Sequence, residues 1–167
     1  MEKYFRDLRF NRIVDDILNN EKFKKTANYR HHGITRYEHS LKVAYHSYII
    51  AKKLHLNYKA VARAGLLHDF FINEDLSPKK QKFSMFFHPY YSIENSTKYF
   101  ELTDMEKDII ITHMFPTLPH KIPKYLESWL VSIVDKIVAT NEFYTSYAKV
   151  HLYKLSNLYL VTLFLRK

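Results

Sequence analysis

Histidines and aspartates that interrupt apolar segments are the residues of this chain best suited to chemistry. The chain has 10 His, and three positions stand out: His39, the adjacent pair His68 and Asp69, and Asp135, which lies in the otherwise largely apolar run 131–138. A carboxylate buried without a partner costs roughly several kcal/mol, so each of these aspartates needs one. A divalent cation shared by imidazole and carboxylate groups would satisfy the whole set, because imidazole binds Fe, Mn, Ni and Zn.

Each of these positions, taken alone, has a simpler structural alternative. A histidine near a helix end is often capped or solvated, and a buried aspartate is often satisfied by a backbone N–H or an arginine. The order of the residues along the chain, with two of them adjacent at positions 68 and 69, favours a shared ligand over separate structural roles.

The composition excludes several classes of site. Cysteine is absent, which excludes disulfides, cysteine-ligated zinc, iron–sulfur clusters and a cysteine nucleophile. The 2 glycines cannot form a Gly-rich phosphate loop or a dinucleotide-binding fingerprint. The formal net charge of +9 indicates either a basic surface without a specific role or an anionic partner, such as a phosphorylated metabolite, nucleotide, nucleic acid or anionic lipid.

Hydrophobic periodicity predicts an all-α fold, a compact orthogonal helical bundle formed by a single domain over residues 1–167. Pro89 suits the first turn of a helix, and Thr103 with Glu106 forms a capping box. Residues 28–36 are expected to form a loop, and residues 73–84 a loop or a short helix. The expected helices cover residues 5–18, 37–55, 58–70, 89–100, 103–115 and 125–148, and a last helix ends near residue 165.

The order of the four chemical residues resembles the H…HD…D signature of the HD superfamily of metal-dependent phosphohydrolases, which lies on an all-helical core. Residues 38–44, EHSLKVA, match the EHS-x-x-VA segment common in that superfamily. Residues 64–69, AGLLHD, match its A-x-LLHD segment. The resemblance covers residues 30–143 and implies an HD-domain-like fold with flanking N- and C-terminal helices.

Two further histidines, His88 and His113, extend the resemblance to branches with an H…HD…H…H…D pattern, which hold two metal ions bridged by the aspartate of the pair. One such bacterial branch hydrolyses diadenosine tetraphosphate. The alternative is that His88 caps its helix and His113 is a buried helix-end residue. For this chain the resemblance implies divalent transition metal ions, two per chain, with Fe or Mn expected and Ni, Zn, Co or Mg as alternatives. The implied ligands are His39, His68, Asp69 and Asp135 for the first ion, and Asp69, His88 and His113 for the second.

Arg36 and His32 are the expected substrate contacts, and we assign the catalytic role to Asp69 and Arg36. Arg36 lies three residues before His39, about one helical turn away, where it could reach a phosphate. Residues 68–75 read HDFFINED, so the lysine of the common HD-x-x-K pattern is absent. No GYP motif follows, so the cyclic-di-GMP phosphodiesterase branch is not supported.

The implied function is hydrolysis of a phosphate ester or anhydride of a small phosphorylated substrate, with a nucleotide as the expected class, by a metal-bridged hydroxide. The alternative is a basic nucleic-acid-binding protein, which the dispersed lysines and arginines disfavour, or a catalytically silent HD module that binds metal or nucleotide without turnover. No signal peptide and no run of roughly 18 apolar residues is visible, so we expect a cytoplasmic protein without a membrane partner. The apolar segment 158–165 could pair with a second copy to form a homodimer.

Overall fold

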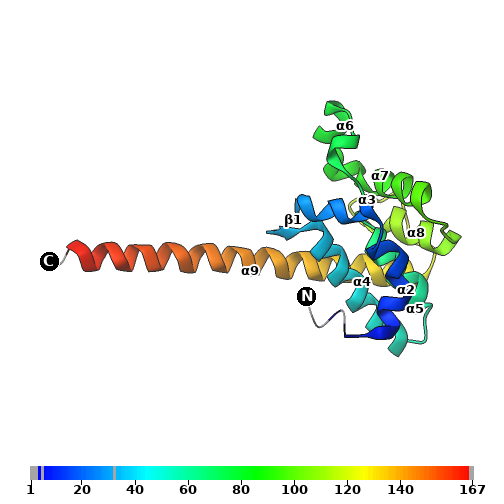
Figure 1. The fold of residues 1–167 in the computed structure, drawn as a ribbon, viewed down its shortest axis with the longest axis horizontal. Helices are drawn as coiled ribbons and strands as arrows, with labels where there is room; N and C mark the ends of the chain where they lie inside the picture. Colours follow the sequence, from blue (N-terminus) through cyan, green and yellow to red (C-terminus); the bar gives the residue numbers. More distant parts are fainter. Residues whose placement is uncertain (1–3, 5, 32, 166–167) are drawn as a thin grey trace.

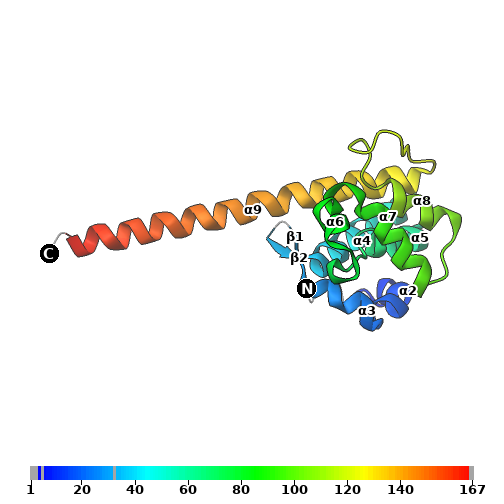
Figure 2. The ribbon, with the colours of Figure 1, turned by 90° about the horizontal axis from the view of Figure 1, so that it is seen from above.

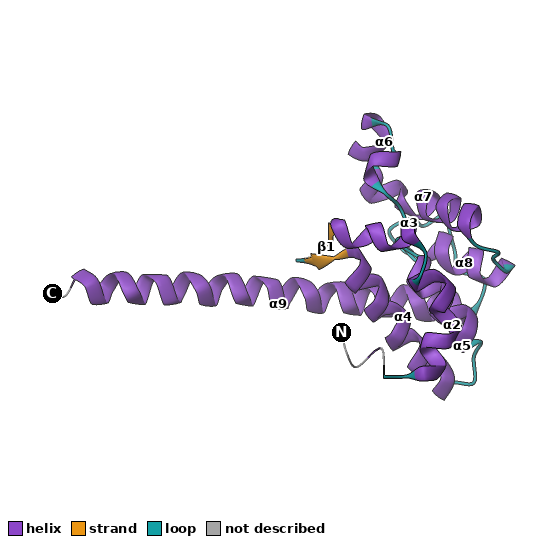
Figure 3. Cartoon of the chain, in the orientation of Figure 1, coloured by secondary structure: helices purple, strands orange, loops and turns teal. Residues whose placement is uncertain are grey.

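The computed structural model describes residue 4, residues 6–31 and residues 33–165, with side chains described up to residue 148 apart from those of residues 31 and 85. The all-α prediction is confirmed, since helices dominate and the described strands form one short pair (Figures 1 and 3). In chain order the elements are α2 (Leu8–Leu18), α3 (Glu21–Lys24), η1 (Lys25–Asn28), β1 (Arg30–His31), β2 (Ile34–Thr35), α4 (Arg36–Lys53), α5 (Tyr58–Leu67), η2 (Asn73–Asp75), α6 (Pro78–Lys82), α7 (Ser84–Tyr99), α8 (Asp104–Thr112) and α9 (Leu126–Leu165).

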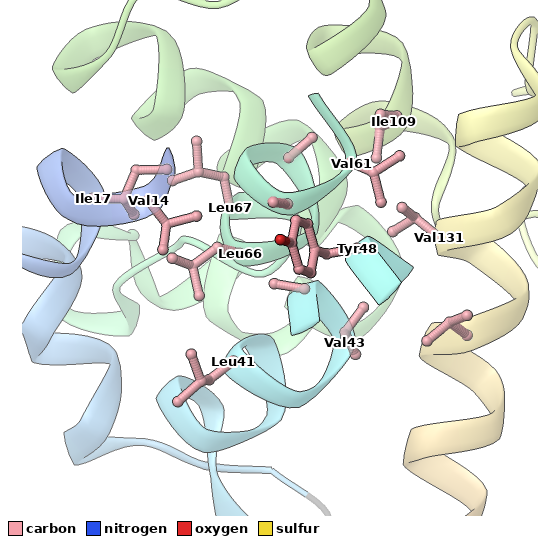
Figure 4. Packing of buried hydrophobic residues seen from close by; sticks show 14 of the residues in the cluster. Val14, Ile17, Leu41, Val43, Tyr48, Val61, Leu66, Leu67, Ile109 and Val131 are labelled. Carbon is pink, nitrogen blue, oxygen red and sulfur yellow. The ribbon is translucent and has the colours of Figure 1, made fainter. Parts of the chain in front are cut away.

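The core forms where α4 and α5 pack against each other and α2, α8 and α9 close around them. Each helix contributes one apolar face, because residues three or four positions apart lie on the same side of a helix. In α4, for example, Leu41, Ala44, Tyr48 and Ala51 are all buried. Figure 4 shows side chains from all five helices meeting, and those labelled are Val14, Ile17, Leu41, Val43, Tyr48, Val61, Leu66, Leu67, Ile109 and Val131.

Gly65 allows α4 and α5 to approach closely near the chemical residues. A Cβ placed at Gly65 would lie 3.0 Å from the Cα of the buried Ala44. Carbon atoms pack at about 3.5–4.0 Å, so a side chain at this position would push the two helices apart. His39 precedes Ala44 by five residues and His68 follows Gly65 by three. The close approach therefore fixes the two segments that carry these histidines relative to each other.

Residues 28–36, for which the sequence predicts a loop, contain a short antiparallel hairpin. β1 pairs with β2, with Arg30 opposite Thr35. Gly33 in the turn has a φ of 91°, in the left-handed region that favours glycine. A Cβ on Gly33 would overlap the side chain of Ser146, so the turn lies against α9. Strands of two residues are too short to produce an alternating pattern, which is why the prediction was wrong here.

α9 is one continuous helix of 40 residues, whereas the sequence predicts two helices in this region. Residues 126–165 contain neither glycine nor proline, so no residue type that ends a helix occurs there. The first part of α9 packs against α4 and α8, and the rest extends away from the bundle (Figures 1 and 2). The prediction of a compact shape is therefore wrong for this helix. The side chains of segment 158–165 lie outside the described ones.

Pro89 lies inside α7, whereas the sequence predicts it in the first turn of a helix. The backbone N–H groups of Phe86 and Phe87 donate to the carbonyl of Phe83, so a full turn forms before the proline. Because proline lacks an N–H, the helix loses one internal hydrogen bond at this point but continues.

The other predicted elements are confirmed with small shifts at their ends. α8 begins with the predicted capping box of Thr103 and Glu106, and the segment 73–84 contains the short helix α6. α5 ends at Leu67, before the predicted end at residue 70. Among the described helices, none combines the length and the apolar character needed to cross a membrane.

The variant Gly65→Val tests the close approach of α4 and α5. We expect its free energy of unfolding to fall by about 1–3 kcal/mol, because the added side chain overpacks a filled core. Urea unfolding followed by circular dichroism measures the change. Lys59→Val, at an exposed position of the same helix, is the control and should lose less than about 1 kcal/mol. Equal losses in the two variants would contradict this account of the packing.

Candidate metal centre

The residues predicted to bind metal come from five helices that meet in the bundle. The start of α4 is fixed by a capping box in which Thr35 and Glu38 each bond the backbone of the other. Two of the histidines occupy the C-cap positions of α5 and α8. From α4, the end of α5, α7, the end of α8 and α9, in that order, the residues are His39, His68 with Asp69, His88, His113 and Asp135.

His39 is fully buried, and both of its ring nitrogens contact carboxylates of α9. Its Nε2 lies 3.0 Å from Oδ1 of Asp135, and its Nδ1 donates to Oε2 of Glu142 at 2.9 Å. Lys42 lies 3.0 Å from the other oxygen of Glu142. Burial opposes protonation, but the hydrogen bonds to Asp135 and Glu142 outweigh it and raise the pKa of His39 to about 10. The two carboxylates therefore favour the protonated form of this ring.

His68 presents an unsatisfied nitrogen to the same region. Its Nδ1 donates to the carbonyl of Gly65 at 2.8 Å. Its Nε2 is buried without a hydrogen-bond partner among the described residues, 3.5 Å from Oδ1 of Asp135 and 3.7 Å from Oδ2 of Asp69. Burial lowers the pKa of His68, but the two nearby carboxylates outweigh burial and raise it. This nitrogen therefore attracts positive charge.

His88 and His113 meet at their Nε2 atoms, which are 2.8 Å apart. Nδ1 of His113 donates to the carbonyl of Ile110 at 2.7 Å. Burial, reinforced by the charges of His68 and His88, lowers the pKa of His113 to about 3. The His113 ring is therefore neutral, and its Nε2 accepts a hydrogen bond from His88. Oδ1 of Asp69 lies 3.2 Å from the His88 nitrogen and 3.8 Å from the His113 nitrogen.

These donor atoms form two groups that could each hold a cation. One group contains His39, His68 and Asp135, the other His68, Asp69 and His113, and the ligand atoms within each group lie within 4.8 Å of one another. Burial raises the pKa of Asp135, but the adjacent His39 and His68 outweigh it and hold this pKa well below its ordinary value. Imidazole and carboxylate are ligands that divalent transition metals accept. The unsatisfied Nε2 of His68 and the close approach of two imidazole nitrogens both fit a cation.

A comparison with protein families gives an independent result. The model of the HD domain family matches residues 36–140, which is more than half of the chain. The chain belongs to the HD domain family. The predicted resemblance to the HD superfamily of metal-dependent phosphohydrolases, whose members bind divalent metals, is thereby confirmed. No curated protein and no solved structure matches the chain.

Arg36, the first residue of the matched HD domain, is buried at the edge of the centre. Its Nη1 donates to the carbonyl of Phe71 at 2.6 Å, and its guanidinium carbon lies 3.6 Å from the centroid of the Phe71 ring. Phe71 stacks on His88, with ring centroids 5.7 Å apart. Arg36 therefore supports the segment that follows Asp69. Its contact with substrate stays a prediction, and His32 lies outside the described residues.

Ser132 and Lys136 of α9 fix the end of α8, where His113 lies. The hydroxyl of Ser132 donates to the carbonyl of His113 at 2.8 Å. Nζ of Lys136 donates to the same carbonyl at 2.8 Å, and also to the carbonyl and hydroxyl oxygens of Ser132. These bonds connect two helices of the HD domain directly behind one of its histidines.

Glu142 and Lys42 adjoin the HD centre. Glu142 lies outside the family motifs in the sequence, and Lys42 occupies an unspecified position of the EHS-x-x-VA segment. Glu142 is 3% exposed and lies two residues beyond the matched range. The spacing along the helices could have identified both residues. Glu142 follows Asp135 by seven residues, and Lys42 follows His39 by three. Residues three or seven apart share one face of a helix, so each pair could have been placed together.

The variant Arg36→Met tests the support that Arg36 gives to Phe71. We expect the free energy of unfolding to fall by about 1–3 kcal/mol, because the buried carbonyl of Phe71 loses its donor while the length of the side chain is kept. Urea unfolding provides the measurement. Arg30→Met, at an exposed position, should change it by less than about 0.5 kcal/mol. If Arg36→Met is as stable as this control, the bond does not support the segment.

Proposed function

We propose that this protein is a metal-dependent phosphohydrolase that cleaves a phosphate ester or anhydride of a small phosphorylated substrate, with a nucleotide as the substrate class. The observation that carries the proposal is the position of Asp69. One of its carboxylate oxygens lies 3.7 Å from the Nε2 of His68, and the other lies 3.2 Å from the Nε2 of His88. A carboxylate with its two oxygens turned to different histidines is suited to bridge a pair of cations.

The two donor groups, together with His88 beside Asp69, support the ligand sets that the family resemblance implies. Iron or manganese is the metal we favour for this mixture of imidazole and carboxylate ligands, with nickel, zinc, cobalt and magnesium as alternatives. Bound divalent cations supply a water nucleophile at neutral pH and neutralise charge on a phosphate group. The ligands would be His39, His68, Asp69 and Asp135 for the first cation, and Asp69, His88 and His113 for the second.

Side chains near the centre are suited to bind a substrate that carries both a negative charge and an aromatic ring. The guanidinium of Arg36 is a buried positive charge that interacts electrostatically with Asp69, so it attracts anions to the edge of the centre. Phe86 and Phe87 precede His88 in α7 and are 46% and 45% exposed, which disfavours a role in core packing. Exposed aromatic rings of this kind stack on nucleic-acid bases. These features support a nucleotide, and the net charge of +9 supports an anionic substrate.

The variant Asp69→Asn tests the proposed activity. We expect metal-dependent hydrolysis to fall by at least about 100-fold, because the bridging carboxylate loses its charge and one of its ligand oxygens. The assay is phosphate release from a panel of nucleotides and phosphate esters with Mn²⁺ or Fe²⁺. Asp15→Asn, at an exposed position of α2, should keep the wild-type rate. A wild-type protein without metal-dependent activity on any member of the panel would count against the proposal.

The number of bound cations tests the two donor groups separately. Elemental analysis of protein purified without chelator should find two divalent ions per chain in the wild type. It should find one in His113→Ala, because the group around His39 remains complete. His46→Ala, at an exposed position of α4, should keep both ions. A single ion in the wild type as well as in His113→Ala would rule out the second cation.

A further inference from the structure

Glu142 contacts the one ring nitrogen of His39 that a cation in the centre would not use. Asp135 and Glu142 are seven residues apart on α9, so two helical turns bring their carboxylates to the same face. They reach opposite edges of one imidazole, Asp135 at Nε2 and Glu142 at Nδ1. The Nε2 edge belongs to the group of donor atoms that could hold a cation, because it faces Asp135 and His68.

Glu142 is itself held in place. Its side chain is 3% exposed, and its second oxygen lies 3.0 Å from Nζ of Lys42. Lys42 follows His39 by one turn of α4, so the same helix face presents both the imidazole and the ammonium group to this carboxylate. A buried carboxylate with two fixed donors cannot rotate away from His39 without losing both contacts.

We propose that Glu142 is a positioning residue for the metal centre, an inference that rests on the proposed function. A carboxylate can only accept a hydrogen bond, so it keeps a proton on Nδ1 of His39 and leaves the lone pair of Nε2 for the cation. It also fixes the plane of the ring and makes the nitrogen a stronger donor. The functional unit therefore extends past the matched range 36–140 to residue 142 of α9.

The Nδ1 atoms of His68 and His113, the other two histidines of these donor groups, are held by backbone carbonyls and not by a carboxylate. Nδ1 of His68 donates to the carbonyl of Gly65, and Nδ1 of His113 donates to the carbonyl of Ile110, each three residues earlier in the chain. His68 and His113 occupy C-cap positions, where a helix leaves carbonyls free to accept a side-chain bond. His39, in contrast, lies within α4, where the carbonyl of Arg36 belongs to the hydrogen bonding of the helix itself. Among these three rings, it is the one whose Nδ1 partner is a charged side chain.

The first test is the affinity for Zn²⁺ of the full chain, measured by competition with a chromophoric chelator. Glu142→Gln removes the negative charge of the partner and should raise the Kd by about 10- to 100-fold, the usual effect of mutating the partner of a ligating histidine. Glu127→Gln is the matched control. Glu127 is also a buried carboxylate of α9, 8% exposed, but it accepts from the backbone N–H of Asn57 instead. This control should bind Zn²⁺ with the wild-type Kd.

The second test separates a positioning role from a purely structural one. Nitrogen-15 NMR of the Zn²⁺-loaded protein should show a proton on Nδ1 of His39, and Glu142→Gln should shift or remove this signal. The Nδ1 signals of His68 and His113 should stay unchanged, because their partners are backbone carbonyls. Loss of stability alone would not change the protonation of one selected ring.

The outcomes distinguish this inference from the proposed function. A wild-type protein that binds no divalent metal overturns both. A wild-type protein that binds Zn²⁺, with Glu142→Gln equal to it in Kd and in the His39 signal, overturns only the role of Glu142. If Glu142→Gln does not fold, Lys42→Met serves instead, since it keeps the carboxylate and removes its anchor. It should weaken Zn²⁺ binding severalfold, and an unchanged Kd overturns the inference.

Discussion

Two carboxylates on one face of α9 hold a buried imidazole of α4 from both sides, and the arrangement of the centre depends on this contact. Asp135 and Glu142 cannot be buried alone, because an unpaired carboxylate away from water costs roughly several kcal/mol. His39 satisfies both at 3.0 and 2.9 Å, provided that α9 presents this face to α4. The same orientation brings Asp135 to within 3.5 Å of His68 at the end of α5. The ion-paired ring of His39 thus fixes the positions of α4, α5 and α9 relative to one another.

The centre concentrates charge where a helical bundle would ordinarily place apolar side chains. Asp135 is ionised, and the carboxylates raise the pKa values of His39 and His68. At the other end of the cluster, burial and like charges lower the pKa of His113 to about 3. The carboxylates therefore favour the protonated forms of the imidazoles nearest to Asp135, whereas burial favours the neutral form of His113. Divalent cations would replace those protons with charge that all of the donors share, and metal binding and proton release are coupled for this reason.

The helices, and the segments that carry the proposed ligand residues, could be predicted from the sequence because both leave local marks. Caps and apolar spacing placed α4, α5 and α8, and the motifs around positions 39 and 68 pointed to the centre. Contacts between distant residues leave no such mark. His39 and Glu142 are 103 positions apart, and only the packing of α9 against α4 brings them together. The split of α9 into two helices was wrong because it assumed a break where no helix-breaking residue occurs.

The first part of α9 stabilises the bundle and positions the centre through neighbouring faces. Val131, Val134 and Val138 are buried at spacings of three and four residues, which forms an apolar face. Asp135 and Glu142 repeat at seven residues on the adjoining face, because one residue turns a helix by about 100°. Packing of the valines therefore sets the rotation of α9 about its axis, and that rotation decides whether the carboxylates reach His39. In this HD domain the packing that holds the fold and the geometry that would hold a cation cannot vary independently.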